Sequence, residues 1–491
     1  MAERGWPWLV ALEVSLALIL IINPVGFLGG GLDDWHYLNA ARCWAAHGPC
    51  LPQDHWQGRW PVAAPIGASI FLLGENRFSV GLPSLGYMLG CLLLVSHLGN
   101  RLFGPPVGPM AALLLLAAPV VGIELLDPNA GSAELLFLLA SASFVAAYAR
   151  QQRRWQAFAA GLAWSLAFQV RETAIVGLPL LLIAAWLKAR HDRSALLLAA
   201  LGAALPLAAE MLIFWQQTGD PLWRRHLAVA HTQISSSELL GPIDRDQPPF
   251  FNPAYIANWR HEPGISLHWA IDGLANLVVN LKAGTTIAVA LILTPLLAAT
   301  LSRRDRVCLL LCLAAALWWA SALIYALAVD PKARMMLVPV VLTSIAVALL
   351  VRQLMRRGST ALALTIVTAI WLVGMTAILS HPHLRTSETK ARLWVRQYPG
   401  EVEIDLTSRR NLALVPEAAG FAEMGSNRRY LVIRLNLDCR LWAERSFDGA
   451  LALVERVALS PNERIAPDRG NLCLFRYNRP IDPRAIAQAK Q

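Results

Sequence analysis

Two adjacent carboxylates, Asp33 and Asp34, follow directly on the first long apolar stretch of this 491-residue chain. Placing two like charges beside a hydrophobic segment costs desolvation and mutual repulsion, so such a pair usually has a chemical task. A carboxylate in this position is suited to remove a proton from a hydroxyl group as a general base. Asp33 could instead cap the helix expected to start near Trp35, but a cap requires one carboxylate and the sequence supplies two. We therefore predict a catalytic role for the pair.

Further acids and bases stand at the ends of other apolar stretches. They are Asp127, the pair Arg171 and Glu172, and the cations Lys332 and Arg334. If the loops that carry them meet at one cavity, a carboxylate could remove a proton while cations hold a phosphate leaving group. The plainer interpretation is a scatter of solvated loop charges, with a self-neutralising pair at 171–172 and snorkelling side chains at 332 and 334. The set favours a transfer reaction on a phosphate-linked substrate.

The elements that must position these residues are membrane-spanning helices. Hydrophobic residues make up 56% of the chain and charged residues only 15%, whereas a soluble domain carries about 25% charge. Apolar runs of about 20 residues, enough to cross a bilayer, recur as far as residue 379. The sequence predicts an all-α polytopic membrane protein with about eleven transmembrane helices. We place them near residues 8–28, 78–100, 107–125, 131–149, 156–170, 173–188, 195–215, 284–301, 307–329, 335–351 and 360–379.

Basic residues set the expected orientation. The short turns at 150–154, 188–193, 303–306 and 352–357 are rich in arginine, and the positive-inside rule places them, with the N-terminus, in the cytoplasm. The first span has no cleavage site after it and is expected to be retained. The outer side then receives the loops 29–77 and 216–283, together with every candidate site residue. Lys332 and Arg334 lie on the side where few cations are expected, which favours phosphate binding.

Residues 381–491 differ in kind from the transmembrane domain predicted over residues 1–380. Charged residues become frequent, and the alternating runs Tyr430–Leu435 and Asn471–Tyr477 predict strands. We expect a small extracytoplasmic α/β domain with a docking or stabilising role. Cysteine pairs fall in the first outer loop and in this domain, and either disulfides or free thiols are compatible with the sequence. They are Cys43 with Cys50, and Cys439 with Cys473.

The run from Leu32 to Arg42, which contains both aspartates and Tyr37, resembles the Asp-Glu-x-x-Tyr-x-x-x-Ala-Arg signature of GT-C glycosyltransferases. The closest branch is that of the protein O-mannosyltransferases and lipid A aminoarabinose transferases, which is glycosyltransferase family 39-like. Similar elements follow in the same order, at Arg59–Pro65, Glu124–Pro128, Ala163–Thr173 and Pro331–Pro339. The chain departs from the pattern in having Asp34 for glutamate, Met335 for tyrosine, and Arg171-Glu172 for a Lys-Gly turn.

The resemblance implies inverting, single-displacement transfer of a sugar from a polyprenyl-phosphate donor to an acceptor hydroxyl at the outer membrane face. Asp33 would be the general base, supported by Asp34, and Asp127 would position the acceptor or the base. The donor phosphate would be held by Arg59, Lys332 and Arg334, and further cavity candidates are Tyr37, Arg42, Arg171 and Glu172.

The same resemblance implies a bacterial-type inner membrane, with the active site and C-terminal domain in the periplasm. No cofactor is required and no metal ligands are assigned, although oligosaccharyltransferase-like relatives would allow a divalent cation. The partners are the donor, membrane lipids and a lipid, glycan or protein acceptor. A nucleic-acid partner is not expected, because the net charge of +10 is largely accounted for by the cytoplasmic turns.

Two other functions remain open. A lipid or lipid-linked-sugar transporter or flippase would use polar residues near the bilayer midplane, and the candidates are Glu13, Glu134 and Glu210. An outer-face polysaccharide ligase would rely on arginine and histidine in the outer loops, such as His226 and His231. Sugar transfer that survives the change Asp33→Asn would exclude the proposed base, and lipid movement without transfer would favour the transporter.

Overall fold

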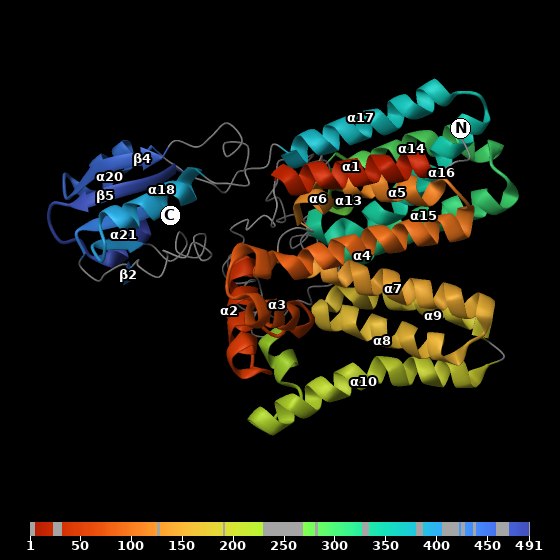
Figure 1. Ribbon diagram of the computed structural model, residues 1–491, viewed down its shortest axis with the longest axis horizontal. Helices are drawn as coiled ribbons and strands as arrows, with labels where there is room; N and C mark the ends of the chain where they lie inside the picture. The colour runs from red at the N-terminus through yellow and green to blue at the C-terminus, as the bar shows by residue number, and fades with distance from the viewer. Residues whose placement is uncertain are drawn as a thin grey trace.

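The computed structural model describes twelve segments of the chain: residues 5–22, 32–124, 128–189, 192–228, 269–279, 283–326, 333–379, 386–404, 422–423, 428–435, 438–457 and 471–490. Long, roughly parallel helices form one body, and a small sheet with its helices lies beyond the end of the bundle at which α2 (Leu32–His47) and α3 (Trp60–Leu73) lie (Figure 1). The predicted fold class is therefore confirmed.

The predicted spans all coincide with helices. These are α1 (Trp6–Ile22), α4 (Arg77–Phe103), α5 (Val107–Leu116), α6 (Pro119–Glu124), α7 (Ala130–Gln151), α8 (Arg154–Val170), α9 (Leu178–Ala189), α10 (Arg193–Thr218), α14 (Gly284–Leu297), α15 (Arg303–Ser321), α16 (Leu337–Arg356) and α17 (Thr360–Leu379). A further helix, α13 (Trp269–Val279), lies in the stretch 216–283 that the sequence analysis predicts as an outer loop. Short helical turns continue some of them, namely η1 (Glu172–Gly177), η2 (Ala298–Thr300), η3 (Ala322–Ala326) and η4 (Ala333–Met336).

The expected number of about eleven spans is not confirmed. Among the described residues, six helices are long and apolar enough to cross a membrane, or seven if the bent pair α13 and α14 counts as one span. The difference arises where a predicted span is short or broken. The stretch 107–125, for example, is divided into α5 and α6 just before Pro119, a residue that has no backbone N–H and interrupts the helical hydrogen bonds.

Close helix crossings hold the bundle together. Helix α16 is buried along most of its length and packs against α5, α14, α15 and α17. Helices α8 and α10 approach through glycines: a Cβ atom at Gly161 would lie 1.9 Å from the carbonyl oxygen of Ala199, and one at Gly202 would lie 2.1 Å from that of Phe158. Backbones can come this close only where no side chain intervenes.

The helices α2 and α3 form a layer across one end of the bundle, with α2 running crosswise to the long helices (Figure 1). The loop between them is tied down by a disulfide, Cys43–Cys50, and by a 2.6 Å contact from His36 Nδ1 to an Asp54 carboxylate oxygen. Burial alone would raise the pKa of Asp54, but the hydrogen bonds from His36 and the backbone of Gln57 outweigh it and the pKa lies below its ordinary value. This loop leads directly into the candidate site.

The C-terminal region contains a five-stranded mixed sheet in the order β2-β1-β3-β5-β4. Its strands are β1 (Val402–Ile404), β2 (Ala422–Glu423), β3 (Tyr430–Leu435), β4 (Leu451–Val457) and β5 (Asn471–Tyr477), and its helices are α18 (Thr386–Gln397), α20 (Cys439–Phe447) and α21 (Pro483–Lys490). The two predicted strands are confirmed as β3 and β5. Separate apolar clusters cover the two faces of the sheet, and a second disulfide, Cys439–Cys473, joins α20 to β5. Both cysteine pairs that the sequence left open are thus bonded.

Candidate active site

Buried arginines gather where α3, α8 and the end of the bundle meet. Arg59 precedes the first residue of α3, and Arg171 lies between α8 and η1. Both side chains are almost fully buried, and Arg59 and Arg334 are close enough to Arg171 to interact with it electrostatically. Because like charges repel in a medium of low dielectric constant, such a cluster requires anionic partners.

Arg59 connects this cluster to the helix that carries the aspartate pair. Its Nη1 donates a 2.5 Å hydrogen bond to the hydroxyl of Tyr37, and its Nη2 lies 2.7 Å from Nε2 of His55. The cationic guanidinium can only donate, so His55 Nε2 accepts. His55 also lies 4.0 Å from the carboxylate of Glu172. These contacts join α2, the α2–α3 loop and η1 into one polar layer.

Arg171 is held by the neighbouring helix α7. Its Nη1 lies 3.4 Å from one carboxylate oxygen of Glu134, and the Thr173 hydroxyl donates a 2.6 Å hydrogen bond to the other. All three side chains are buried. Glu134 is therefore shared between a charged and a neutral donor.

Arg224, in the helical turn 223–228, forms the other half of the network. Its guanidinium donates to Glu172 at 2.9 and 3.2 Å and to Glu210 of α10 at 3.2 Å. It also reaches the carbonyl oxygens of Gly58 and Phe168, each at 3.4 Å. One side chain thus fastens the segment after α10 to α8, η1 and the α2–α3 loop.

The structure brings together five of the residues predicted from the sequence. Tyr37, Arg59, Arg171, Glu172 and Arg334 share this network through contacts or electrostatic interaction.

Among the described residues, Arg42, which the sequence analysis names as a cavity candidate, pairs with an acid outside the cluster. It makes a bidentate pair with Glu75, and both side chains are about one-third exposed. Tyr37 and Ala41, four residues apart, form the buried face of α2 that contacts Arg59. Arg42 follows Ala41 by one residue, so it lies on a different face of the helix.

Other predicted residues cannot be placed in full. Asp33 and Asp34 lie in the first turn of α2, but their side chains are outside the described part of the chain, as are Asp127, Lys332 and His231. Helical spacing puts position 33 one turn before Tyr37 on the same face of α2. His226 is exposed and pairs with Asp220 at 2.7 Å, so it does not join the arginine cluster.

Four members of the network are only weakly indicated by the sequence, namely His55, Glu134, Glu210 and Arg224. The two glutamates stand out as carboxylates inside apolar stretches, where an ionised side chain requires a partner. The partners themselves are separated by 37 residues for Arg171 with Glu134 and by 52 for Arg224 with Glu172. No local pattern connects positions that far apart.

An apolar cavity of about 320 Å³ lies beside the network. Gly58 and Trp60, which flank Arg59 in the chain, form part of its wall. Other residues of α2 and the α2–α3 loop, together with side chains of α8 and α10 that include Leu166, Pro206 and Glu210, complete it. A hydrocarbon chain would find an apolar environment there with buried charge at its border.

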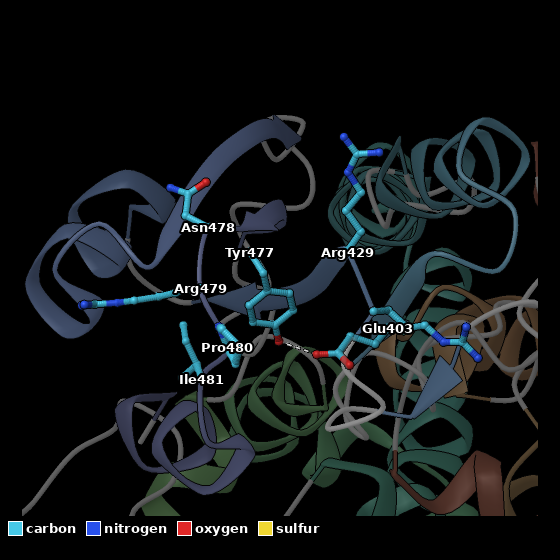
Figure 2. Close-up of a pocket in the computed structure, with 8 residues that line it drawn as sticks. Glu403, Arg429, Tyr477, Asn478, Arg479, Pro480 and Ile481 are labelled. Carbon is cyan, nitrogen blue, oxygen red and sulfur yellow. Dashed lines mark hydrogen bonds between the residues drawn. The ribbon is translucent and has the colours of Figure 1, made fainter.

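A second cavity, of about 300 Å³, lies in the C-terminal region. Figure 2 shows the Tyr477 hydroxyl directed at Glu403, to which it donates a hydrogen bond, while Arg429 and Arg479 extend in different directions. Its cationic groups do not converge, unlike those around Arg171, so we assign the chemistry to the arginine cluster. Within the described segments, no group of three or more His, Cys, Asp or Glu side chains could hold a metal ion.

Comparisons with known proteins bear on the fold and on the broad class of the protein. The sequence profile of the family "Dolichyl-phosphate-mannose-protein mannosyltransferase" matches residues 61–215, which include Arg171, Glu134 and Glu210. No curated protein matches the sequence significantly.

Among solved structures, ArnT from Cupriavidus metallidurans bound to undecaprenyl phosphate aligns with a TM-score of 0.53 and 13% identity, covering 96% of this chain and 98% of ArnT. The apo form of the same protein gives a TM-score of 0.43 at 12% identity, covering 97% and 98%. The Archaeoglobus fulgidus oligosaccharyltransferase complex with Zn and sulfate gives 0.48 at 11% identity, covering 89% of this chain and 68% of that one. The predicted GT-C fold is confirmed, and the family match with this fold supports a membrane glycosyltransferase.

Proposed function

We propose that this GT-C protein transfers a sugar from a polyprenyl-phosphate donor to an acceptor hydroxyl at the outer face of the membrane, with inversion at the anomeric carbon. The observation that carries the proposal is the buried arginine cluster, which Arg59 joins to Tyr37 of α2, the helix that contains positions 33 and 34. A phosphate leaving group and a hydroxyl nucleophile need cations and a base within one small volume. The solved relative that covers nearly the whole chain was crystallised with undecaprenyl phosphate, which supports the donor class.

In the proposed reaction, the acceptor oxygen attacks the anomeric carbon as the bond from that carbon to the phosphate oxygen breaks. The acceptor proton passes to Asp33, with Asp34 in support, and polyprenyl phosphate leaves with the electron pair. Arg59, Lys332 and Arg334 stabilise the charge that develops on the phosphate through charge-assisted hydrogen bonds. Asp127 positions the acceptor or the base.

The surroundings of the cluster suit a lipid-linked substrate. The apolar cavity beside Arg59 offers room for hydrocarbon near the charged end of the molecule, and the buried arginines are kept away from bulk water. The site faces the periplasm of a bacterial-type inner membrane in this proposal, and residues 381–491 form an outer domain that stabilises or docks. No step requires a metal ion.

Transfer of labelled sugar from polyprenyl-phosphate donors to membrane extracts tests the proposal. Asp33→Asn should lower kcat by roughly 10²- to 10⁴-fold, because the variant keeps the shape of the side chain but loses the base. Asp34→Asn should lower it less. Wild-type rates in Asp33→Asn would refute the assignment of the base, and failure of the wild-type protein to use any such donor would refute the function.

A further inference from the structure

Arg171 is the most enclosed guanidinium of the cluster and has an incomplete set of partners. Its side chain is 4% exposed, and its contact with Glu134 is a single one at 3.4 Å. Within the described part of the chain, its buried Nε has no hydrogen-bond partner. A buried N–H that gives up water without gaining an acceptor destabilises the folded state.

Among the described residues, the two acids nearest to Arg171 already have other partners. Glu134 must divide its two oxygens between Arg171 and the hydroxyl of Thr173, and Glu172 is engaged by Arg224. Arg59 and Arg334, in contrast, add positive potential at Arg171. A further anion in this volume would therefore be stabilised by three arginines at once.

We propose that Arg171 is a ligand of the substrate's phosphate, and that Glu134 and Thr173 are positioning residues that hold its guanidinium ready. This inference rests on the proposed function and adds one phosphate ligand and two positioning residues to it. Glu134 fixes one edge of the guanidinium, and Thr173 fixes Glu134. When the phosphate binds, its oxygen accepts a hydrogen bond from the Nε–H of Arg171, and its negative charge is stabilised by the surrounding arginines.

Preorganisation is the physical reason for such an arrangement. A free arginine side chain would lose several rotatable bonds on binding, whereas one already held by a buried carboxylate has lost them on folding. Removing Glu134 would leave the charge of Arg171 in place but release its geometry. The expected consequence is weaker phosphate binding without loss of the base.

Binding of undecaprenyl phosphate to the purified full-length protein in nanodiscs is the direct test, with neutral undecaprenol as the matched probe. Arg171→Gln should raise the Kd for undecaprenyl phosphate by at least about tenfold, since a charge-assisted pair is lost. Glu134→Gln and Thr173→Val should raise it by smaller factors, and Arg171→Lys should restore part of the affinity. Binding of undecaprenol should be the same in all of these proteins.

A second buried ion pair provides the structural control. Arg352 lies 3.1 Å from Asp305 at the opposite end of the bundle, and its side chain is 5% exposed. Asp305→Asn should therefore affect thermal stability about as much as Glu134→Gln but should leave the Kd unchanged. If Glu134→Gln changes only stability, Glu134 is a structural residue and the positioning role is refuted.

The kinetic version separates this inference from the proposed function. With a polyprenyl-phosphate sugar, Glu134→Gln should raise the donor KM more than it lowers kcat. An active enzyme in which folded Arg171→Gln binds undecaprenyl phosphate as wild type would overturn the inference while leaving the function standing. Wild-type protein that transfers no sugar but shows the predicted Kd changes would overturn the function and leave the phosphate site.

Discussion

Replacing Arg224 by glutamine removes a side chain that connects four parts of the polar layer. Its partners are Glu172 and Glu210, and the carbonyl oxygens of Gly58 and Phe168. The change leaves the carboxylate of Glu210, which is 8% exposed, with the amide of Gln169, at 3.4 Å, as its hydrogen-bond partner in the described part of the chain. We expect a loss of stability together with a loss of activity, because the residues of the site share this network.

The magnitude follows from the burial of the two charges. Breaking a buried ion pair by removing one partner costs about 3–5 kcal/mol, since the other charge stays in the protein without compensation. The contact with Glu172 adds little, about 1 kcal/mol or less, because that carboxylate is 37% exposed and water screens it. The double variant Arg224→Gln/Glu210→Gln should recover much of the loss, since no unpaired buried charge remains.

Equilibrium unfolding of the protein in detergent, followed by tryptophan fluorescence, measures these differences. Arg225→Gln is the matched control. Arg225 is the next residue in the chain and its side chain is exposed, so its replacement should change the free energy of unfolding by less than about 0.5 kcal/mol. If Arg224→Gln is as stable as wild type, or if the double variant is destabilised by the sum of the two single changes, the network does not support the layer as described.

Three further outcomes are expected. Gly161→Val should destabilise the α8–α10 crossing by about 1–3 kcal/mol or more, because the added side chain overpacks it. Gly86→Val is the control and should not destabilise the protein in this way, because nothing lies within 4 Å of a Cβ atom added there. Equal unfolding midpoints for the two variants would contradict the close approach of α8 and α10. Replacing Cys439 and Cys473 by serine should lower the free energy of unfolding by roughly 3–4 kcal/mol, because the disulfide joins residues 34 apart in the sequence. Limited proteolysis of the C-terminal region would detect this loss, and unchanged resistance to the protease would contradict it. The pKa of Asp54 lies below its ordinary value, so its ionised form stabilises the folded loop above pH values near 3.9, and this contribution disappears as the pH falls below that value. Asp54→Asn should therefore flatten the acid limb of a plot of stability against pH. An unaltered acid limb would exclude this contribution.

The arginines of the candidate site could be recognised from the sequence because their positions are unusual for a membrane protein. Arg59, Arg171 and Arg334 all follow or precede apolar stretches on the side where the positive-inside rule expects few cations. The structure brings these three together. The roles of Asp33, Asp34, Asp127 and Lys332 stay predictions.

The position of Arg42 depends on more than its place in the signature run. Arg42 belongs to the same signature run as Tyr37, but a helix places residues five apart on different faces, and Glu75 is available at the start of α4 to pair with it. The expected number of about eleven spans is likewise not confirmed. Hydropathy measures how apolar a window is, and it does not register that Pro119 divides one such window into two short helices.

The sequence by itself determined that this chain crosses a membrane many times, that a small mixed domain follows, and that charges gather at one set of loop ends. Each of these properties depends on composition or on neighbours within about 20 residues. Only the tertiary structure decided that Glu134 meets Arg171 and that Arg224 meets Glu172 and Glu210. These partners come from different helices, and the free energy of burying a charge depends on how those helices pack.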